Sequence, residues 1–178
     1  MTILALDTAR KITGYAIYKD GAITESGTWK INQKQLFSDL ERKITSVLNK
    51  YHPTVIVAEN IYKSQDTRLQ SVFDKLSQCH GVLHLISEKT AIPLHLIDPR
   101  RAKREMWGYT TANATHRTMP REQQKARMIR AVERLGYILD TDCNGNKSND
   151  QADAIGILIT YVRAYKIPVR HPTTQDSA

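Results

Sequence analysis

Two apolar runs, each followed by one carboxylate, constrain this chain most. The first run covers residues 2–6 and is followed by Asp7, and the second covers residues 55–58 and is followed by Glu59. Apolar runs of this length are typical of strands that are buried on both faces of a sheet. The pattern therefore predicts an α/β fold in which helices cover both faces.

Asp7 by itself has two interpretations. It can bind a ligand where its strand ends, or it can begin an Asx turn and cap the loop that follows. Glu59 shifts the balance, because the apolar spacing over 33–50 predicts a helix between the two strands. A right-handed crossover through that helix would set the strands parallel. Both acids would then lie at the carboxyl edge of the sheet, where open α/β sheets bind ligands.

Turn signals and apolar spacing predict the remaining elements. The Asp20-Gly21 pair indicates a hairpin, so the first three strands form an antiparallel meander. A last short strand should join the parallel side, which gives a five-stranded mixed sheet, three antiparallel strands followed by two parallel, flanked by helices. We expect one domain over 1–167 and a disordered tail over 168–178. The expected strands are 2–7, 13–18, 22–31, 55–59 and 93–97, and the expected helices are 33–50, 65–89, 120–136 and one that opens at Ser148.

Two helix starts have the spacing of a capping box, Asn32 with Gln35 and Ser148 with Gln151. In the second of these helices, Asp150 and Asp153 are three residues apart and share one face. Acids are common at helix starts, where the helix dipole favours them, and this would explain a single Asp. Two acids on one face of an otherwise apolar helix instead indicate carboxylates that serve a site.

Charge indicates the partner. The chain has 178 residues and a formal net charge of +8, with a pI near 9.5, which favours nucleic acid ahead of a membrane surface. Four cations follow the predicted strand 93–97. Such a run is usually a solvated face, but close to the paired acids we expect it to contact phosphates. The cations of this run are Arg100, Arg101, Lys103 and Arg104, and Arg121 and Lys125 follow on the next helix.

Other site classes find little support. The two cysteines form no CxxC pair, so a disulfide framework or zinc site is not expected, and a reducing compartment is. No signal peptide or run of transmembrane length is recognised, and we expect a cytoplasmic protein with no membrane partner. No Ser/His/Asp pattern indicates a nucleophile. His80 and His84 lack an HExxH motif and are interpreted as packing or surface residues.

These residues also carry a family resemblance. The chain resembles the RuvC Holliday-junction resolvases of the RNase H-like superfamily, and among them the divergent versions encoded by phages of Gram-positive bacteria such as lactococcal phages. The resemblance covers residues 3–162 with gaps. The matching stretches, in the order of the family, are ILALDTARKITGYAI, VIVAENIY, DPRRAKREMWG, EQQKARMIRAVERLG and NDQADAIGILITY.

The resemblance implies an RNase H-like fold and roles for particular residues. Lys103 matches a lysine used near the scissile phosphate, and Tyr62 stands where the family has an aromatic or apolar residue pressed against junction bases. The expected DNA-binding residues are Tyr62, Arg100, Arg101, Lys103, Arg104, Arg121 and Lys125. The expected catalytic and metal-binding acids are Asp7, Glu59, Asp150 and Asp153, with Lys103 as a further catalytic residue.

Converging carboxylates repel one another, and bound cations relieve that repulsion. Mg²⁺ prefers carboxylate oxygens, and we expect it here, with Mn²⁺ as a substitute. Two ions about 3.5–4 Å apart can activate a water molecule for in-line attack on a phosphodiester. The resemblance thus implies a Mg²⁺-dependent endonuclease that nicks Holliday junctions and other branched DNA. It also implies a homodimer, for which the helix 65–89 is the expected interface.

Three features depart from the family. Thr8-Ala9 replaces the Pro-Gly that usually follows the first acid. Glu122 occupies the place of a second family lysine, for which Arg121 or Lys125 can substitute. The loop 108–119 is longer than in bacterial members of the family. That loop is rich in small polar residues, and we expect it to be mobile and to contact DNA.

Two alternatives remain open. A YqgF-like ribonuclease should share the acids but lack Tyr62 and the basic 100–104 turn. A non-catalytic junction-binding protein would gain nothing from four mutually repelling acids.

Overall fold

The computed structural model describes residues 1–62, 70–107, 119–141 and 145–172. Residues 108–118 lie outside the described residues, so the mobility expected of that loop stays a prediction. The first residues of the expected helix 65–89 are outside them too. None of the described helices combines the length and the apolar character that crossing a membrane requires.

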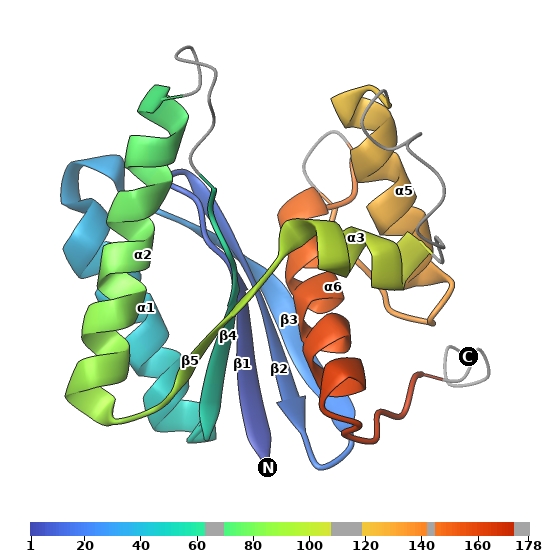
Figure 1. The fold of residues 1–178 in the computed structure, drawn as a ribbon, viewed down its shortest axis with the longest axis horizontal. Helices are drawn as coiled ribbons and strands as arrows, with labels where there is room; N and C mark the ends of the chain where they lie inside the picture. Colours follow the sequence, from blue (N-terminus) through green and yellow to red (C-terminus); the bar gives the residue numbers. More distant parts are fainter. Residues whose placement is uncertain (63–69, 108–118, 142–144, 173–178) are drawn as a thin grey trace.

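A five-stranded mixed sheet forms the centre of the molecule, in the order β3-β2-β1-β4-β5 (Figure 1). The pairs β1–β2 and β2–β3 are antiparallel, whereas β1–β4 and β4–β5 are parallel. This confirms the predicted fold class. The strands are β1 (Thr2–Asp7), β2 (Ile12–Lys19), β3 (Ala22–Lys30), β4 (Val55–Glu59) and β5 (Leu94–Ile97).

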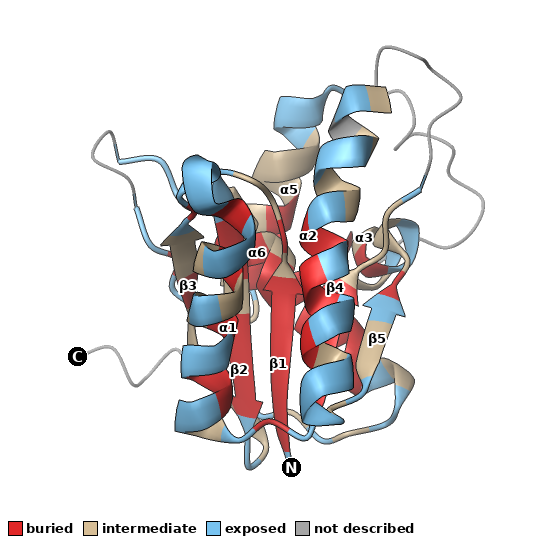
Figure 2. Ribbon diagram, turned by 90° about the vertical axis from the view of Figure 1, so that its left-hand side faces the viewer, coloured by how far each residue is buried: buried red, intermediate tan, exposed pale blue. Residues whose placement is uncertain are grey.

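Helices cover both faces of the sheet, so the molecule has three layers (Figure 1). α1 (Leu36–Tyr51) and α2 (Gln70–Thr90) cover one face. α6 (Asn149–Ala164) crosses the other face, with α3 (Pro99–Trp107) and α5 (Arg121–Glu133) packed against it. The strands β1, β2 and β4 and the helix α6 are the most deeply buried elements, whereas the outer strands β3 and β5 are mostly intermediate or exposed (Figure 2).

The strands alternate between two hydrophobic cores, as the period of two requires. In β1, Ile3 and Ala5 belong to the core beneath α6, whereas Leu4 and Leu6 belong to the core beneath α1 and α2. The alternation fixes the register, because a slip of one residue would exchange the two faces. It also decides which face each strand-terminal residue takes.

The first predicted capping box, Asn32 with Gln35, is correct for Asn32 and wrong for Gln35. Asn32 accepts a hydrogen bond from the backbone of Lys34 and caps a 3-10 turn, η1 (Gln33–Gln35), so that α1 begins at Leu36. The Asn32 N–H donates to the Asp39 carboxylate at 2.9 Å and not to Gln35. An ionised carboxylate is a stronger acceptor than an amide, which accounts for the exchange.

The tail that we expected to be disordered from Pro168 is packed over its first five residues. The Tyr18 hydroxyl donates to the Pro168 carbonyl at 2.5 Å, and the Arg170 N–H donates to the Gly21 carbonyl. One side-chain hydrogen bond from β2 and one backbone hydrogen bond to the β2–β3 turn thus hold 168–172, although this segment has little apolar content. Residues 173–178 lie outside the described residues.

Leu158 tests how far stability depends on the core beneath α6. Its side chain is fully buried there, so Leu158→Ala should lower the free energy of unfolding by about 2–5 kcal/mol through lost transfer energy and a cavity. Ile138→Ala is the matched control, because that side chain is 83% exposed. Urea titration measures both. Equal effects for the two variants would contradict the assigned core.

Candidate active site

Strand alternation brings Asp7 and Glu59 to one place. Ile3 and Ala5 of β1, and Val55 and Val57 of β4, face α6, so the next alternate residue of each strand faces α6 as well. β1 and β4 are parallel neighbours in which Leu6 pairs with Ala58. The two acids therefore follow adjacent positions at the carboxyl edge of the sheet, as the sequence predicts.

Gly14 lets α6 bring its acids to the same edge. Gly14 pairs with Asp7 across β1 and β2, and a Cβ atom at this position would lie 1.9 Å from the Asp150 carbonyl oxygen. The start of α6 thus sits directly on the backbone of β2, where no side chain fits. This contact places Asp150 and Asp153 close to Asp7.

Gln151 fixes the start of α6 from the other side, a role that the capping-box prediction missed. Ser148 Oγ accepts the Gln151 N–H at 3.2 Å, so half of the predicted box is present. The Gln151 side chain is 2% exposed, accepts from Asp140 N at 2.7 Å and donates to Ser26 Oγ at 2.9 Å. This buried amide ties α6 to β3 and holds its first turn, and local sequence gave no sign of either partner.

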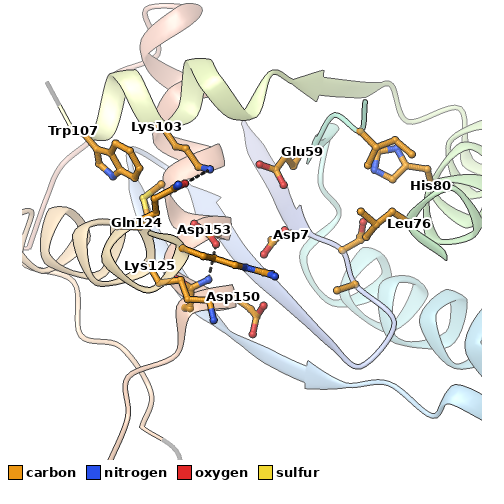
Figure 3. A pocket seen from close by; sticks show the side chains of 16 residues that line it. Asp7, Glu59, Leu76, His80, Lys103, Trp107, Gln124, Lys125, Asp150 and Asp153 are labelled. Atoms are coloured by element: carbon orange, nitrogen blue, oxygen red, sulfur yellow. Dashed lines mark hydrogen bonds between the residues drawn. The ribbon is translucent and has the colours of Figure 1, made fainter. Parts of the chain in front are cut away.

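The four acids line one cavity of about 280 Å³. Figure 3 shows the carboxyl groups of Asp7, Glu59 and Asp153 directed into a common space, with Asp150 at its edge. Cations come from α3 and α5, so the cavity has an acidic floor and a basic side. It is lined by Asp7, Thr8, Ala9, Glu59, Ile61, Leu76, His80, Lys103, Trp107, Arg121, Gln124, Lys125, Met128, Asn149, Asp150 and Asp153.

Burial raises the pKa of all four acids, and repulsion by neighbouring acids raises it further for Asp7, Glu59 and Asp153. Desolvation is the largest cause of the increase for each carboxyl group. It acts with the charge of Asp153 to raise the pKa of Glu59 to about 7, and it raises the pKa of Asp153 to about 6. The pKa of Asp7 is raised well above its ordinary value by burial and by the charges of the other three. The cluster therefore holds excess negative charge that a cation would relieve.

The donor chemistry fits a divalent cation. Asn149 donates to Asp153 Oδ2 at 2.8 Å, and its own Oδ1 is buried and has no hydrogen-bond partner among the described residues. Carboxylate and amide oxygens are hard ligands suited to Mg²⁺ or Ca²⁺. Within the described ranges, no three Asp, Glu, His or Cys side chains are yet close enough to hold an ion together. Repulsion between carboxylates that no cation neutralises accounts for this spacing.

Lys103 is the lining cation whose charge acts on the largest number of the four acids. Its charge lowers the pKa of Asp7, Glu59 and Asp153, opposing the increase caused by burial. Lys103 Nζ donates to Gln124 Oε1 at 3.1 Å (Figure 3). Gln124 Nε2 donates in turn to the Met119 carbonyl at 2.8 Å. Gln124 thus holds the lysine from α5, a contact that sequence reasoning missed.

Both residues that we expected could substitute for the second family lysine lie at the cavity. Glu122, which occupies its place in the sequence, is highly exposed and is outside the cavity lining. Arg121 and Lys125 both line the cavity, and their charges lower the pKa of Asp150. Lys125 also pairs with Glu122 at 3.3 Å.

Four predicted DNA-binding residues lie outside the cavity lining. Tyr62 follows β4 and is 53% exposed, so its ring is not packed in the core. Arg100, Arg101 and Arg104 are exposed on α3. The structure thus separates these residues from the acids, on the surface around the cavity.

His80 has more contact with the site than the sequence indicated. It is 6% exposed on α2, lines the cavity, and donates a hydrogen bond to the backbone carbonyl of Glu59. Burial lowers its pKa. His84 is exposed, as a surface residue should be. No local motif pointed to the His80 contact, because it joins α2 to the end of β4.

Comparison with known proteins gives one family. The family model for crossover junction endodeoxyribonuclease RuvC matches residues 3–161. The chain is 25% identical over 172 residues to crossover junction endodeoxyribonuclease RuvC of Dictyoglomus turgidum, covering 91% of this chain and 96% of that protein. It is 24% identical over 173 residues to the protein of the same name from Endomicrobium trichonymphae, covering 91% and 80%.

Solved structures show a similar fold. The structure described as T. thermophilus RuvC in complex with Holliday junction substrate matches with a TM-score of 0.65 and 12% identity, covering 97% of this chain and 100% of that one. The Fowlpox virus resolvase, in complex with substrate Holliday junction DNA, matches with a TM-score of 0.54 and 14% identity, covering 93% and 99%. At these identities the likeness shows the fold alone.

The raised pKa values predict how metal-free stability depends on pH. In the unfolded chain the acids titrate near pH 4, whereas Glu59 and Asp153 keep protons up to about pH 7 and about pH 6 when folded. The folded state binds more protons in this window, so the free energy of unfolding should fall as pH rises from about 4 to 7. Asp7→Asn removes one repelling charge and should raise the metal-free Tm at pH 7.5 by at least about 2–4 °C.

Calorimetry at pH 5 and pH 7.5 in EDTA measures both effects. Asp20→Asn is the matched control, because Asp20 is exposed and its φ of 51° suits Asn. A Tm for Asp7→Asn below that of the unsubstituted protein at pH 7.5 would contradict the repulsion.

Proposed function

This chain belongs to the RuvC family of crossover junction endodeoxyribonucleases, which are metal-dependent nucleases that act on Holliday junctions, and we propose how its own residues nick branched DNA. The observation that carries the proposal is the convergence of four carboxylates with raised pKa values in one cavity with a basic side. Four-way junctions are the proposed substrate, with forks and flaps as further branched forms.

In this proposal Asp7, Glu59, Asp150 and Asp153 hold Mg²⁺, for which Mn²⁺ can substitute. When bound, such ions supply Lewis acidity and a water of lowered pKa for attack on the phosphodiester. The carboxylates orient the attacking water by accepting its hydrogen bonds. Asn149 keeps Asp153 in place through the hydrogen bond between their side chains.

Lys103 is proposed to face the scissile phosphate, where its ammonium opposes the charge that develops on the phosphoryl oxygens. Arg121 and Lys125 would hold that phosphate from α5, since both line the cavity beside Asp150. Arg100, Arg101 and Arg104 would contact neighbouring phosphates, because they are exposed on the adjoining helix. Phosphate contacts of this kind position DNA without reading its sequence.

We propose that two copies act together. A four-way junction needs two symmetric cuts, so a homodimer places one site on each strand to be cut. α2 is the proposed interface, because it lies on the face opposite α6 and exposes Leu85 at 45%. We also propose that residues 1–167 form one nuclease domain that works in the cytoplasm, that of the bacterial host if the protein is phage-encoded.

The two alternatives differ from this proposal in substrate and in chemistry. The exposed Tyr62 and the basic residues of α3 favour branched DNA over the RNA expected for a YqgF-like ribonuclease. Side-by-side cleavage of four-way DNA and structured RNA separates these two. For a non-catalytic binder, neither substrate would be cut.

Asp7→Asn should abolish cleavage of a four-way junction in Mg²⁺, by at least about 100-fold, while junction binding survives. The reason is that the amide keeps the shape of the side chain but removes a central charge of the metal site. Gel assays of cleavage and of binding in EDTA measure the two properties, with Asp20→Asn as the control that should cleave normally. Retained cleavage by Asp7→Asn would refute the role of this acid.

Tyr62→Ala tests the proposed stacking on an unpaired base. One stacked base is worth about 1–3 kcal/mol, so cleavage of branched DNA at low protein concentration should fall about 5–150-fold while the Tm changes little. Tyr165→Ala is the control, because that ring is similarly exposed, at 56%, but lies at the far end of α6. A large loss of Tm with normal specific activity would instead assign Tyr62 to the core.

A further inference from the structure

A second cavity lies on another face of α5. Its volume is about 350 Å³, and it opens between α3 and α5. The α5 residues that face the catalytic cavity are Arg121, Gln124, Lys125 and Met128. The α5 residues that line the second cavity lie on a different side of the helix. The second cavity is lined by Met106, Trp107, Met119, Gln123, Arg127, Arg130, Ala131 and Arg134.

Arginine sets the charge of this cavity. Its described lining contains Arg127, Arg130 and Arg134 and no acidic residue. These positions are three and four residues apart on one helix, where like charges repel one another. An anion in the cavity that these three arginines line would relieve this repulsion.

The arginines are not equivalent. The Arg127 guanidinium lies 5.4 Å from the centre of the Trp107 ring and is held there as a cation–π pair. Arg130 donates one bond from Nε to the Ala126 carbonyl at 3.2 Å, which directs its guanidinium along the helix. Arg130 and Arg134 are both exposed. Arginine forks match phosphate geometry and can bind two oxygens at once, so a phosphate is the anion that suits them best.

Trp107 connects the second cavity to the catalytic one, because its side chain lines both. α5 forms the wall between them, and a helix with its side chains is about 10–12 Å across. Phosphates along one DNA strand are spaced by about 3.4 Å of helix axis. Successive phosphates also rotate about that axis, so they are farther apart in space than this axial rise. An anion in the second cavity would thus lie roughly two to three nucleotides from a phosphate held beside the four acids.

We infer that the cavity formed by Arg127, Arg130 and Arg134 binds a backbone phosphate of the branched DNA, roughly two to three nucleotides from the bond that is cut. The inference rests on the proposed function. It adds a contact to the arm of the junction that is separate from the contacts made by the residues around the acids. Because the contact is to a phosphate, it contributes affinity and positioning and carries no sequence preference.

The double variant Arg130→Ala/Arg134→Ala tests the contact through its salt dependence. Each phosphate contact contributes about 0.9 to the slope of log K against log salt. Binding to a four-way junction is measured in EDTA, where cleavage does not interfere. If one or both arginines contact phosphate, the slope should become shallower by about 0.9–1.8, with an affinity loss of about tenfold at low salt. The Tm in EDTA should stay within about 2 °C.

The control removes the same charge elsewhere. Lys19 and Lys166 are exposed and lie at the other end of the sheet from the acids, and Asn suits the φ of 54° at residue 166. Lys19→Ala/Lys166→Asn should keep the slope of the unsubstituted protein. A control with the same shallower slope would show a general effect of net charge and would overturn the inference.

Uncharged methylphosphonates, placed one at a time along the cleaved strand, locate the contact. For the unsubstituted protein, a replacement two to four nucleotides from the cleavage site should weaken binding about 3- to 10-fold. In Arg130→Ala/Arg134→Ala the same replacement should cost little more, because its partner is gone. Equal losses in both proteins at every position would overturn the inference. Such a result would overturn only this inference. The proposed function would still stand as long as the unsubstituted protein binds and cuts the junction.

Discussion

Repulsion among four buried carboxylates is the interaction on which the rest of this structure depends. Asp7, Glu59, Asp150 and Asp153 share one cavity; desolvation raises the pKa of each, and the charges of neighbouring acids raise it further for Asp7, Glu59 and Asp153. Bringing these acids together does not stabilise the fold, because each ionised carboxylate raises the free-energy cost of ionising a neighbouring one. A divalent cation turns the same arrangement into binding energy. The basic residues on the other side of the cavity, Lys103, Arg121 and Lys125, would then bind an anionic substrate.

The scaffold makes this arrangement rigid. Two acids lie at the ends of central strands, and two lie within the first five residues of a buried helix, so none of the four depends on a long loop. Gly14 permits the approach of α6, and Gln151 holds it through two buried hydrogen bonds. Elements fixed in this way place a site more reliably than mobile segments do.

The sequence was sufficient for the sheet and for the four acids, because both follow from local patterns. Strand alternation and the helix between the two acid-ended strands determine that Asp7 and Glu59 meet. Long-range contacts could not be predicted from such local patterns. The partners of Gln151, the contact of His80 with Glu59 and the packing of 168–172 join segments whose separation in the chain hides them. The second face of α5 was hidden for another reason, since its arginines resemble an ordinary solvated helix surface.

Proton release on metal binding tests the central claim most directly. Titration calorimetry with Mg²⁺ and with Mn²⁺ at pH 6.5, repeated in buffers of different ionisation enthalpy, counts the protons that leave as the ion binds. Glu59 and Asp153 titrate near 7 and near 6 in the metal-free protein, so the account predicts binding with a net release of protons that disappears near pH 8.5. Absence of metal binding, or binding with no proton release at pH 6.5, would contradict it.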